Sequence, residues 1–258
     1  MPDNRPSPRK HLKRRSYENL VFGRQPVVEL LQSDKEVEQV LLQAASTGEA
    51  ISAIRKICSE KDIPVKTVPP EKLSRLTGGN HQGVIAFTSP VRFQQLEDIV
   101  QHTIEQGEAP LILLLDHITD MGNFGAICRT AWAAGVHAIV IPTSGAAPVN
   151  GDAIKASAGA LQMLPVCRVA RLEDALDYLR LNGLLIIGAA AEGNTTPAQT
   201  DFSIPCAIVM GSEDEGISPG IRPQLTATVA IPMQRPFDSY NVSVACGMLL
   251  YECMRQRQ

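Results

Sequence analysis

The chain has 258 residues, of which 44% are hydrophobic and 20% are charged, and this composition is typical of a globular protein. No apolar run approaches the roughly 20 residues of a membrane-spanning helix, and the opening residues MPDNRPSPRK lack the apolar stretch of a signal peptide. We therefore expect a cytoplasmic protein with no membrane partner, long enough for one large domain or for two smaller domains with separate cores.

The net charge of −3 does not by itself indicate a nucleic-acid-binding protein, but the charge is unevenly distributed. Residues 1–24 contain seven Lys and Arg residues and only two acidic residues. Because residues 1–18 also have no apolar periodicity, we predict a basic, disordered tail there that contacts phosphate groups. A solvated tail with no partner explains this composition equally well.

The six cysteines are dispersed along the chain. None belongs to a C-x-x-C pair, and no His lies near one at zinc-binding spacing. We therefore predict reduced thiols in the core and no metal site. The cysteines are Cys58, Cys128, Cys167, Cys206, Cys246 and Cys253.

Alternating helical and strand patterns predict a small α/β domain over residues 19–92. Helices are expected at 24–31, 50–59 and 70–76, and strands at 37–43, 63–68 and 83–88. The following residues, 93–108, are polar, and we predict that they form a linker containing a helix.

A second α/β domain is predicted over residues 109–258. Strands are expected at 111–116, 136–142, 164–169, 184–190, 207–211 and 228–231, and helices at 124–134, 152–162, 172–181 and 242–255. Since strand and helix alternate throughout, the sheet should be mainly parallel, with helices on both faces.

Three polar clusters follow predicted strands, at the edge where ligands bind in open α/β sheets. In the first, Asn123 begins a helix and Arg129 follows among apolar residues, where burial without an anionic partner would be costly. In the second, Glu213 lies in an acidic, glycine-containing turn, and in the third, Ser239 and Asn241 precede an apolar helix. Each cluster also has a plain structural explanation: an Arg with a packed stem and a solvated head, an acidic turn before a helix, and a helix N-cap.

In order and spacing, the three clusters resemble the three motifs of the SpoU (TrmH-like) branch of the SPOUT RNA methyltransferases. Residues 20–90 are similar to the L30e-like substrate-binding domain of that family, through the stretches FGRQPVVELL and NHQGVIA. Two positions depart from the family pattern, because Tyr240 replaces a Leu and residues 234–237 lack a Gly. The matching residues are Asn123, Gly125, Arg129, Thr130, Ala131 and Gly135, then Gly211, Ser212, Glu213 and Gly216, then Ile231, Pro232, Met233, Ser239, Asn241, Val242, Ser243, Val244 and Ala245.

The resemblance implies an α/β fold whose C-terminal, mainly parallel sheet contains a trefoil knot, preceded by the small L30e-like domain. It implies S-adenosylmethionine as the cofactor, bent within the knot and held largely by backbone groups, and no metal. The walls of the cofactor pocket would be Ala189, Ala190, Gly211, Ile231, Met233, Tyr240 and Val242.

The resemblance also implies methylation of a ribose 2′-hydroxyl in structured RNA. The chain is most similar to the RlmB-type enzymes, which modify a guanosine of large-subunit (23S) ribosomal RNA. Transfer RNA is the alternative substrate, and a non-catalytic RNA-binding protein is the alternative of a different class.

For the reaction, the resemblance points to Arg129; because a guanidinium is not a credible base, we expect it to clamp a phosphate in two-point geometry and to stabilise the developing alkoxide. Asn123 and Glu213 would orient Arg129 and the ribose, while Ser239 and Asn241 would shape the third motif. The family resemblance further implies a homodimer that packs through helices including the C-terminal one, on apolar residues such as Val244, Met248 and Leu249.

Overall fold

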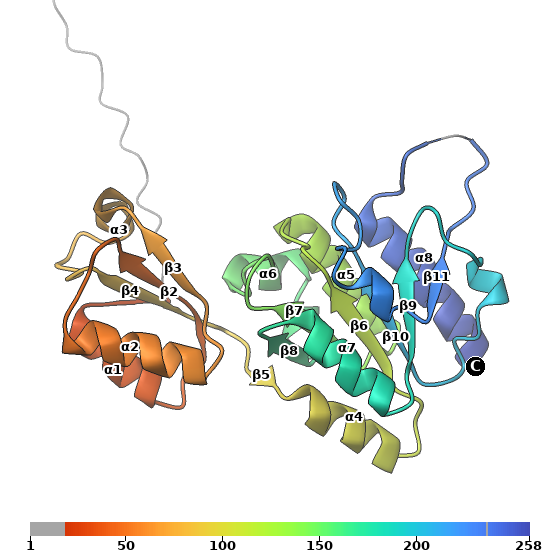
Figure 1. Ribbon diagram of the computed structural model, residues 1–258, viewed down its shortest axis with the longest axis horizontal. Helices are drawn as coiled ribbons and strands as arrows, with labels where there is room; N and C mark the ends of the chain where they lie inside the picture. Colours follow the sequence, from red (N-terminus) through yellow and green to blue (C-terminus); the bar gives the residue numbers. More distant parts are fainter. Residues whose placement is uncertain (1–18, 236) are drawn as a thin grey trace, which may run out of the picture.

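The computed structural model describes residues 19–235 and 237–258, which form two α/β bodies side by side along the long axis of the molecule (Figure 1). The tail predicted at residues 1–18 lies outside the described residues.

The N-terminal body is built on a mixed four-stranded sheet in the order β1-β4-β2-β3, in which β1–β4 and β4–β2 are antiparallel and β2–β3 is parallel. Every helix and strand predicted for residues 19–92 is confirmed, with small shifts at the ends. β1 was not predicted, because a three-residue strand has no readable period and is fixed by its partner β4. The elements are β1 (Leu20–Phe22), α1 (Arg24–Gln32), β2 (Val37–Gln43), α2 (Glu49–Glu60), β3 (Val65–Val68), α3 (Pro70–Leu76) and β4 (Val84–Thr88).

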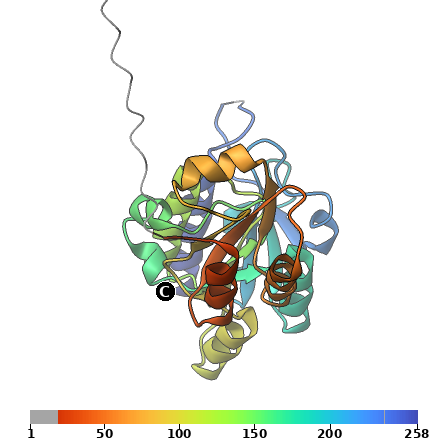
Figure 2. The ribbon, with the colours of Figure 1, turned by 90° about the vertical axis from the view of Figure 1, so that its left-hand side faces the viewer.

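The alternation of side chains along these strands separates two cores. Val40 and Leu42 pack with α1 and α2 on one face, while Leu41 packs against Leu73 of α3 on the other. Figure 2 shows α1 and α2 below this sheet and α3 above it.

The C-terminal body is built on a seven-stranded sheet in the order β11-β9-β10-β6-β7-β8-β5, and all its strand pairs are parallel. The predicted α/β class, with a mainly parallel C-terminal sheet and a small N-terminal domain, is therefore confirmed. The elements are β5 (Phe93–Gln94), α4 (Leu96–Glu105), β6 (Leu111–Leu115), α5 (Met121–Ala133), β7 (Ala138–Pro142), α6 (Gly151–Ala156), β8 (Val166–Val169), α7 (Leu172–Leu181), β9 (Leu185–Ala189), β10 (Cys206–Met210), β11 (Ala227–Val229) and α8 (Val242–Arg257), with short 3-10 turns at Ala160–Gln162, Pro197–Gln199 and Arg222–Gln224.

Helices cover both faces of this sheet, as predicted. Leu113 and Ile139 point to the face covered by α5, α6 and α8, whereas Ile112 and Leu114 point to the face covered by α4 and α7. Both faces are buried, so the strands are almost wholly apolar and carry no period of two. The trefoil knot, and the likeness of the small domain to L30e, stay predictions.

Two segments differ from expectation. Residues 93–108 were expected to be a linker containing a helix; the helix is present as α4, but its Leu96 and Val100 are buried against the large sheet, and the segment also contributes β5, which pairs with β8. Helix α6 stops at Ala156 instead of continuing to residue 162, because Ala158 and Gly159 take left-handed backbone angles, with φ of 50° and 88°.

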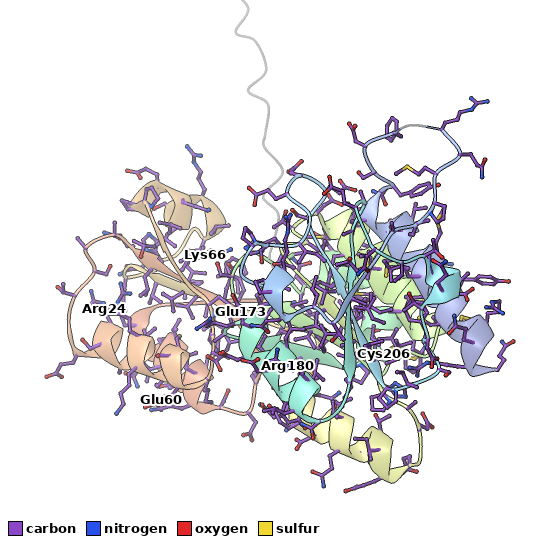
Figure 3. The ribbon with its side chains drawn as sticks, turned by 45° about the vertical axis from the view of Figure 1, so that its right-hand side comes forward. Arg24, Glu60, Lys66, Glu173, Arg180 and Cys206 are labelled. Carbon is purple, nitrogen blue, oxygen red and sulfur yellow. The ribbon has the colours of Figure 1, made fainter. Side chains whose placement is uncertain are left out.

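The six cysteines are buried and unpaired, as predicted, and burial raises the pKa of Cys58 to about 11 and that of Cys246 to about 12. Figure 3 shows Cys206 inside the C-terminal body, among the strands. Within residues 19–235 and 237–258, no group of His, Cys, Asp and Glu could hold a metal ion, and no helix has the length and apolarity to span a membrane.

Candidate active site

The three polar clusters meet at the carboxyl edge of the large sheet. In the strand register, Met210 at the end of β10 lies beside Leu115 of β6 on one side and Ala189 of β9 on the other. Ala189 in turn pairs with Val229 of β11. Because these four parallel strands end at the same level, the loops that follow them are neighbours although they are far apart in sequence.

Asn123, Glu213 and Asn241 form a hydrogen-bonded group that joins all three loops. Oε1 of Glu213 accepts hydrogen bonds from Nδ2 of Asn241 at 2.6 Å and from Nδ2 of Asn123 at 3.2 Å. Nδ2 of Asn241 also donates to Oδ1 of Asn123 at 3.0 Å. The backbone N–H of Val242 approaches the same carboxylate oxygen at 3.4 Å. One carboxylate oxygen is thus held by three N–H donors, two of them side-chain amides.

The helix cap of α8 fixes the direction of the Asn241 amide. Its Oδ1 accepts from the backbone N–H groups of Ser243 at 3.0 Å and Val244 at 3.3 Å, which is ordinary N-cap geometry. Since the oxygen faces the helix, the amide nitrogen must face Glu213. The N-cap interpretation of Asn241 is therefore confirmed, and the same geometry leaves its amide nitrogen available to the polar group; its role in an active site stays a prediction.

Asn123 lies in the first turn of α5, and there the helix cap holds its backbone. Oδ1 of Asp120 caps this helix by accepting from the backbone N–H of Asn123 at 2.8 Å. Two residues further, a Cβ on Gly125 would lie 2.4 Å from the Cβ of Ala156, so the close packing of α5 on α6 requires glycine there.

Glu213 lies in a tight loop after β10. Ser212 and Gly216 exchange backbone hydrogen bonds of 3.1 and 3.0 Å, and a Cβ on Gly211 would lie 2.1 Å from the carbonyl carbon of Gly216. Gly211, which the resemblance places in the wall of the cofactor pocket, is thus needed here because the chain folds back on itself.

Asp116 supports this loop and was missed as a site residue. Its carboxylate is buried, and Oδ2 accepts from the backbone N–H of Ser218 at 2.7 Å, while Oδ1 contacts Nδ1 of His117 at 2.6 Å. A single acid directly after the wholly apolar strand β6 was the available signal, because a buried carboxylate must find donors.

Arg129 and Ser239 stand apart from this group. Both are exposed, and neither makes a side-chain hydrogen bond or ion pair with any residue of the described chain. Contrary to expectation, Asn123 and Glu213 do not hydrogen-bond to Arg129 in this structure, because they bond to each other and to Asn241 instead, through Oε1 of Glu213.

The residues expected to hold the cofactor share the same edge. Their side chains are small or apolar apart from Tyr240, which leaves backbone N–H and C=O groups as the polar contacts for a ligand. The hydroxyl of Tyr240 donates to the carbonyl of Pro232 at 3.3 Å, which closes the loop that leads into α8. Gly211 and Val242 are buried, and Ala189, Ala190, Ile231, Met233 and Tyr240 are half-buried. This donor set fits a nucleoside bound through backbone groups.

Two family models match this chain and together cover almost all of the described residues. The SpoU rRNA Methylase family matches residues 110–251, and the RNA 2′-O ribose methyltransferase substrate binding domain matches residues 20–94. YacO of Bacillus subtilis, a TrmH family protein, is 32% identical over 92% of this chain and 95% of its own length. A tRNA/rRNA methyltransferase of Mycolicibacterium vanbaalenii is 35% identical over 93% of this chain and 77% of its own length.

Solved structures show the same architecture. The SpoU methyltransferase AviRb from Streptomyces viridochromogenes, in complex with the cofactor AdoMet, has a TM-score of 0.59 at 26% identity and covers 92% of this chain and 89% of its own. An AdoMet-bound rRNA methyltransferase from Sinorhizobium meliloti shares the fold with a TM-score of 0.58 at 24% identity, over 92% and 87% of the two chains. The chain belongs to the SpoU rRNA methylase family and carries that family's RNA 2′-O ribose methyltransferase substrate-binding domain at its N-terminus.

Proposed function

We propose that this protein transfers a methyl group from S-adenosylmethionine to a ribose 2′-hydroxyl of RNA, and that its target is a guanosine of large-subunit ribosomal RNA. The observation that carries the proposal is the group of Asn123, Glu213 and Asn241, which joins the three family motifs at one sheet edge. Membership of the SpoU family and the AdoMet complex of AviRb support the choice of cofactor.

The cofactor would lie against the half-buried residues Ala189, Ala190, Ile231, Met233 and Tyr240, with Gly211 and Val242 beneath. When bound, it supplies an electrophilic methyl group with its own leaving group. The protein therefore has to bind the nucleoside, orient the ribose and manage the proton and charge of the 2′-oxygen.

Arg129 is suited to stabilise the negative charge that develops on the 2′-oxygen. A guanidinium is not a credible base, because arginine stays protonated in proteins. With no partner among the described residues, its planar fork is free to bind a phosphate in two-point geometry and to stabilise the developing alkoxide.

Glu213 is suited to orient the ribose. Its Oε1 is saturated by donors from three residues, whereas Oε2 makes no hydrogen bond with any residue of the described chain. Asn123 and Asn241 thereby hold the carboxylate so that one oxygen stays available to accept a hydrogen bond from the 2′-hydroxyl. Ser239, exposed just before the α8 cap, would contact the nucleotide.

RNA capture is assigned to residues 19–92, aided by the basic residues of the tail. The family matched at residues 110–251 is one of rRNA methylases, and a separate substrate-binding domain suits a large folded RNA. Several relatives are described as acting on tRNA or rRNA, so transfer RNA is the alternative substrate. A protein acting on these RNAs would work in the cytoplasm.

We also propose that the protein is a homodimer through α8 and α5. Val244, Met248 and Tyr251 form an exposed apolar stripe along α8, and Trp132 of the adjacent helix α5 is 42% exposed. Leu249, which was also expected in this interface, is fully buried in the core of one chain. Exposed large apolar side chains grouped on packed helices are typical of a protein interface.

The proposal is tested by titrating the protein with S-adenosylmethionine in a calorimeter and then measuring methyl transfer to RNA. The RNA comes from a strain that lacks the gene, separated into 23S, 16S and transfer RNA. We expect cofactor binding and transfer to 23S RNA alone. Transfer to the tRNA fraction would select the alternative substrate. RNA binding without cofactor binding would show a non-catalytic RNA-binding protein and refute the proposal.

A further inference from the structure

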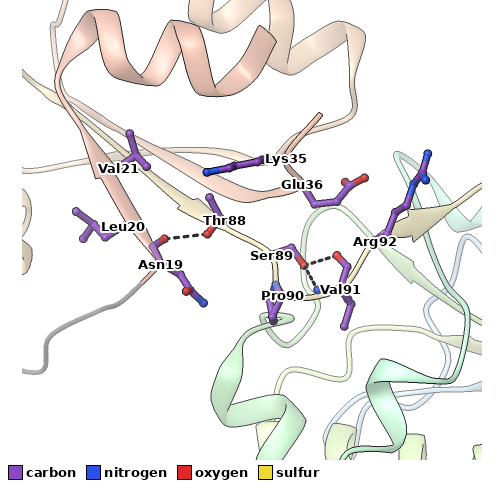
Figure 4. Close-up of a pocket in the computed structure, with 10 residues that line it drawn as sticks. All are labelled: Asn19, Leu20, Val21, Lys35, Glu36, Thr88, Ser89, Pro90, Val91 and Arg92. Atoms are coloured by element: carbon purple, nitrogen blue, oxygen red, sulfur yellow. Dashed lines mark hydrogen bonds between the residues drawn. The ribbon is translucent and has the colours of Figure 1, made fainter. Parts of the chain in front are cut away.

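The connection between the two bodies is short. β4 ends at Thr88 and β5 begins at Phe93, so only residues 89–92 lie between the two sheets. Four residues span at most about 14 Å when extended. Figure 4 shows that this segment borders a cavity. Within the segment, the hydroxyl of Ser89 donates to the carbonyl of Val91 at 2.8 Å. The backbone N–H of Ser89 donates to the carbonyl of Glu36 at 2.9 Å, which fastens the start of the segment to the small domain.

One arginine of the large sheet reaches across this junction. Arg168, on β8, donates from Nη1 to the carbonyl of Glu38 and from Nη2 to the carbonyl of Val37, both at 3.0 Å. Its guanidinium also lies 3.9 Å from the centre of the Phe93 ring, at the end of the connecting segment. The side chain is only 7% exposed. Two hydrogen bonds from one buried guanidinium to consecutive carbonyls of β2 fix the orientation of β2 relative to β8 as well as the distance between them.

A glutamate reaches back in the opposite direction. Oε1 of Glu38, on β2 of the small domain, accepts from the backbone N–H of Val149 at 2.9 Å, in the loop before α6. Oε2 of Glu38 lies 3.8 Å from Nη1 of Arg168 and, among the described residues, has no hydrogen-bond partner. Each domain thus inserts one charged side chain against the backbone of the other.

This arrangement is a costly way to gain stability. Burial raises the pKa of Glu38 and lowers that of Arg168, because both charges have lost water. Buried ion pairs of this kind often contribute less than apolar residues of the same size would. The two bodies also have separate cores, so neither needs the contact in order to fold. What the contact does specify is the orientation of one domain on the other.

That orientation bears on the site. β8 is parallel to β6 and β10, so Arg168 lies towards the same carboxyl edge that carries Asn123, Glu213 and Asn241. Figure 1 shows the small domain beside β8 and α6. An RNA held by the small domain would therefore present one particular ribose to the site only while the domains keep this arrangement.

We propose that Arg168 and Glu38 form an interdomain clasp, which fixes the distance and orientation of the RNA-binding domain relative to the methyl-transfer site. Both are therefore positioning residues for the reaction on RNA. The proposal rests on the proposed function in taking residues 19–92 as the RNA-binding part. It predicts that loosening the clasp leaves cofactor binding and RNA binding almost unchanged but lowers the rate of transfer and the selectivity among riboses.

The test begins without RNA. Spin labels are placed on cysteines introduced at Glu60 and Arg180, which lie on the surfaces of the two bodies (Figure 3) and have side chains 60% and 53% exposed. The native cysteines are buried and should not react. Double electron–electron resonance measures the distance between the two labels. It should give one narrow distribution of this distance in the parent protein and a broad one in Arg168→Gln. Arg171→Gln is the matched control, since Arg171 is 65% exposed and should leave the distribution narrow.

A second variant keeps the test valid if Arg168→Gln does not fold. Arg168→Met combined with Glu38→Gln removes both buried charges at similar volume, which often preserves or raises stability. The double variant loses the hydrogen bonds from Arg168 to the two carbonyls, so the distribution of distances between the labels should broaden in the same way. A narrow distribution in this folded double variant would overturn the clasp.

The functional readout is single-turnover transfer to 23S RNA from the deletion strain, with the methylated riboses mapped. We expect the rate at saturating RNA to fall roughly ten- to hundredfold in the clasp variants, as for other small misplacements of a substrate, and neighbouring riboses to be modified. Broad distances with an unchanged rate and a single modified site would overturn the positioning role. If the parent protein methylates no RNA, the proposed function fails, while the resonance distances still decide whether the clasp exists.

Discussion

Asn241 donates a 2.6 Å hydrogen bond from Nδ2 to Oε1 of Glu213, while Oδ1 of the same amide caps helix α8. The helix cap holds the Asn241 amide in one orientation, and the amide in turn holds the Glu213 carboxylate. A residue that the sequence marks as a helix N-cap therefore also connects loops that are distant in sequence. The two roles can be separated by mutation, because Asp caps a helix as well as Asn does but has no N–H groups to donate.

Asn241→Asp should therefore keep the fold and lose activity. We expect the free energy of unfolding to change by no more than about 1 kcal/mol, and single-turnover transfer to fall roughly a hundredfold, because a second carboxylate would face Glu213. Asn150→Asp is the matched control, since Asn150 caps α6 through Oδ1, at 2.9 Å from the N–H of Asp152, and lies outside the site. Equal rates for the two variants would remove Asn241 from the active site.

Arg129 should be needed in its own geometry, not only for its charge. Both Arg129→Lys and Arg129→Ala should lower single-turnover transfer by about a hundred- to thousandfold, because Lys has no planar fork. Cofactor affinity and melting temperature should change little, since this side chain is exposed and unpaired among the described residues. A folded Arg129→Ala protein with near-normal transfer would contradict the assignment.

Glu38→Gln should change how stability depends on pH. Burial raises the pKa of Glu38, against the lowering effects of the Val149 N–H, Arg168 and Lys66. A carboxyl group with a raised folded-state pKa stabilises the fold below its unfolded pKa, and this contribution is lost as the pH rises through the folded pKa. Glutamine does not ionise, so the variant should gain stability relative to the parent as the pH rises from the ordinary glutamate pKa of about 4.3 towards neutrality. Chemical unfolding at several pH values measures the difference, and a constant difference would contradict the expected shift.

The large domain should be separable only if it keeps β5 and α4. A fragment of residues 91–258 should fold, bind S-adenosylmethionine and bind RNA weakly. A fragment of residues 107–258 should be much less stable, because it loses the burial of Leu96 and Val100, each contributing about 1.5–3 kcal/mol. Thermal melting with and without cofactor compares the fragments. Equal stability would show that residues 93–106 are dispensable after all.

The apolar stripe on α8 should hold two chains together. Met248→Glu should shift the protein towards monomer in light scattering at micromolar concentration, because it places a charge in an apolar interface. Leu181→Glu is the control, since Leu181 is 85% exposed on α7, away from the stripe. A parent protein that is already monomeric would contradict the proposed dimer.

Much of the fold could be read from the sequence because its signals are local. The strands Leu111–Leu115 and Cys206–Met210 are uninterrupted apolar runs, and α2 has a regular apolar face. β1 and β5 could not be read, because strands of three and two residues exist only through their partners β4 and β8. Helix α4 was expected, but not its burial, because its polar residues outnumber the few that pack.

For the candidate site, the sequence indicated which residues to consider but not how they contact one another. Asn123, Glu213 and Asn241 were named from their places after predicted strands and from the family resemblance, but their mutual hydrogen bonds depend on where four strands end in three dimensions. The support from Asp116 and the clasp from Arg168 could not be anticipated either. Their partners lie 102 and 130 residues away, and although the position of Asp116 after β6 signals a buried carboxylate, nothing in the local sequence identifies which residues it or Arg168 will contact.

The central claim is tested most directly by mapping 2′-O-methylated riboses in RNA from three strains: a deletion strain, the same strain carrying the intact gene, and the same strain carrying the gene for Arg129→Ala at equal protein level. We predict that one guanosine of 23S ribosomal RNA loses its 2′-O-methyl group in the deletion strain, regains it with the intact gene, and stays unmodified with Arg129→Ala. An unchanged set of 2′-O-methylated riboses in all three strains, across ribosomal and transfer RNA, would contradict the account.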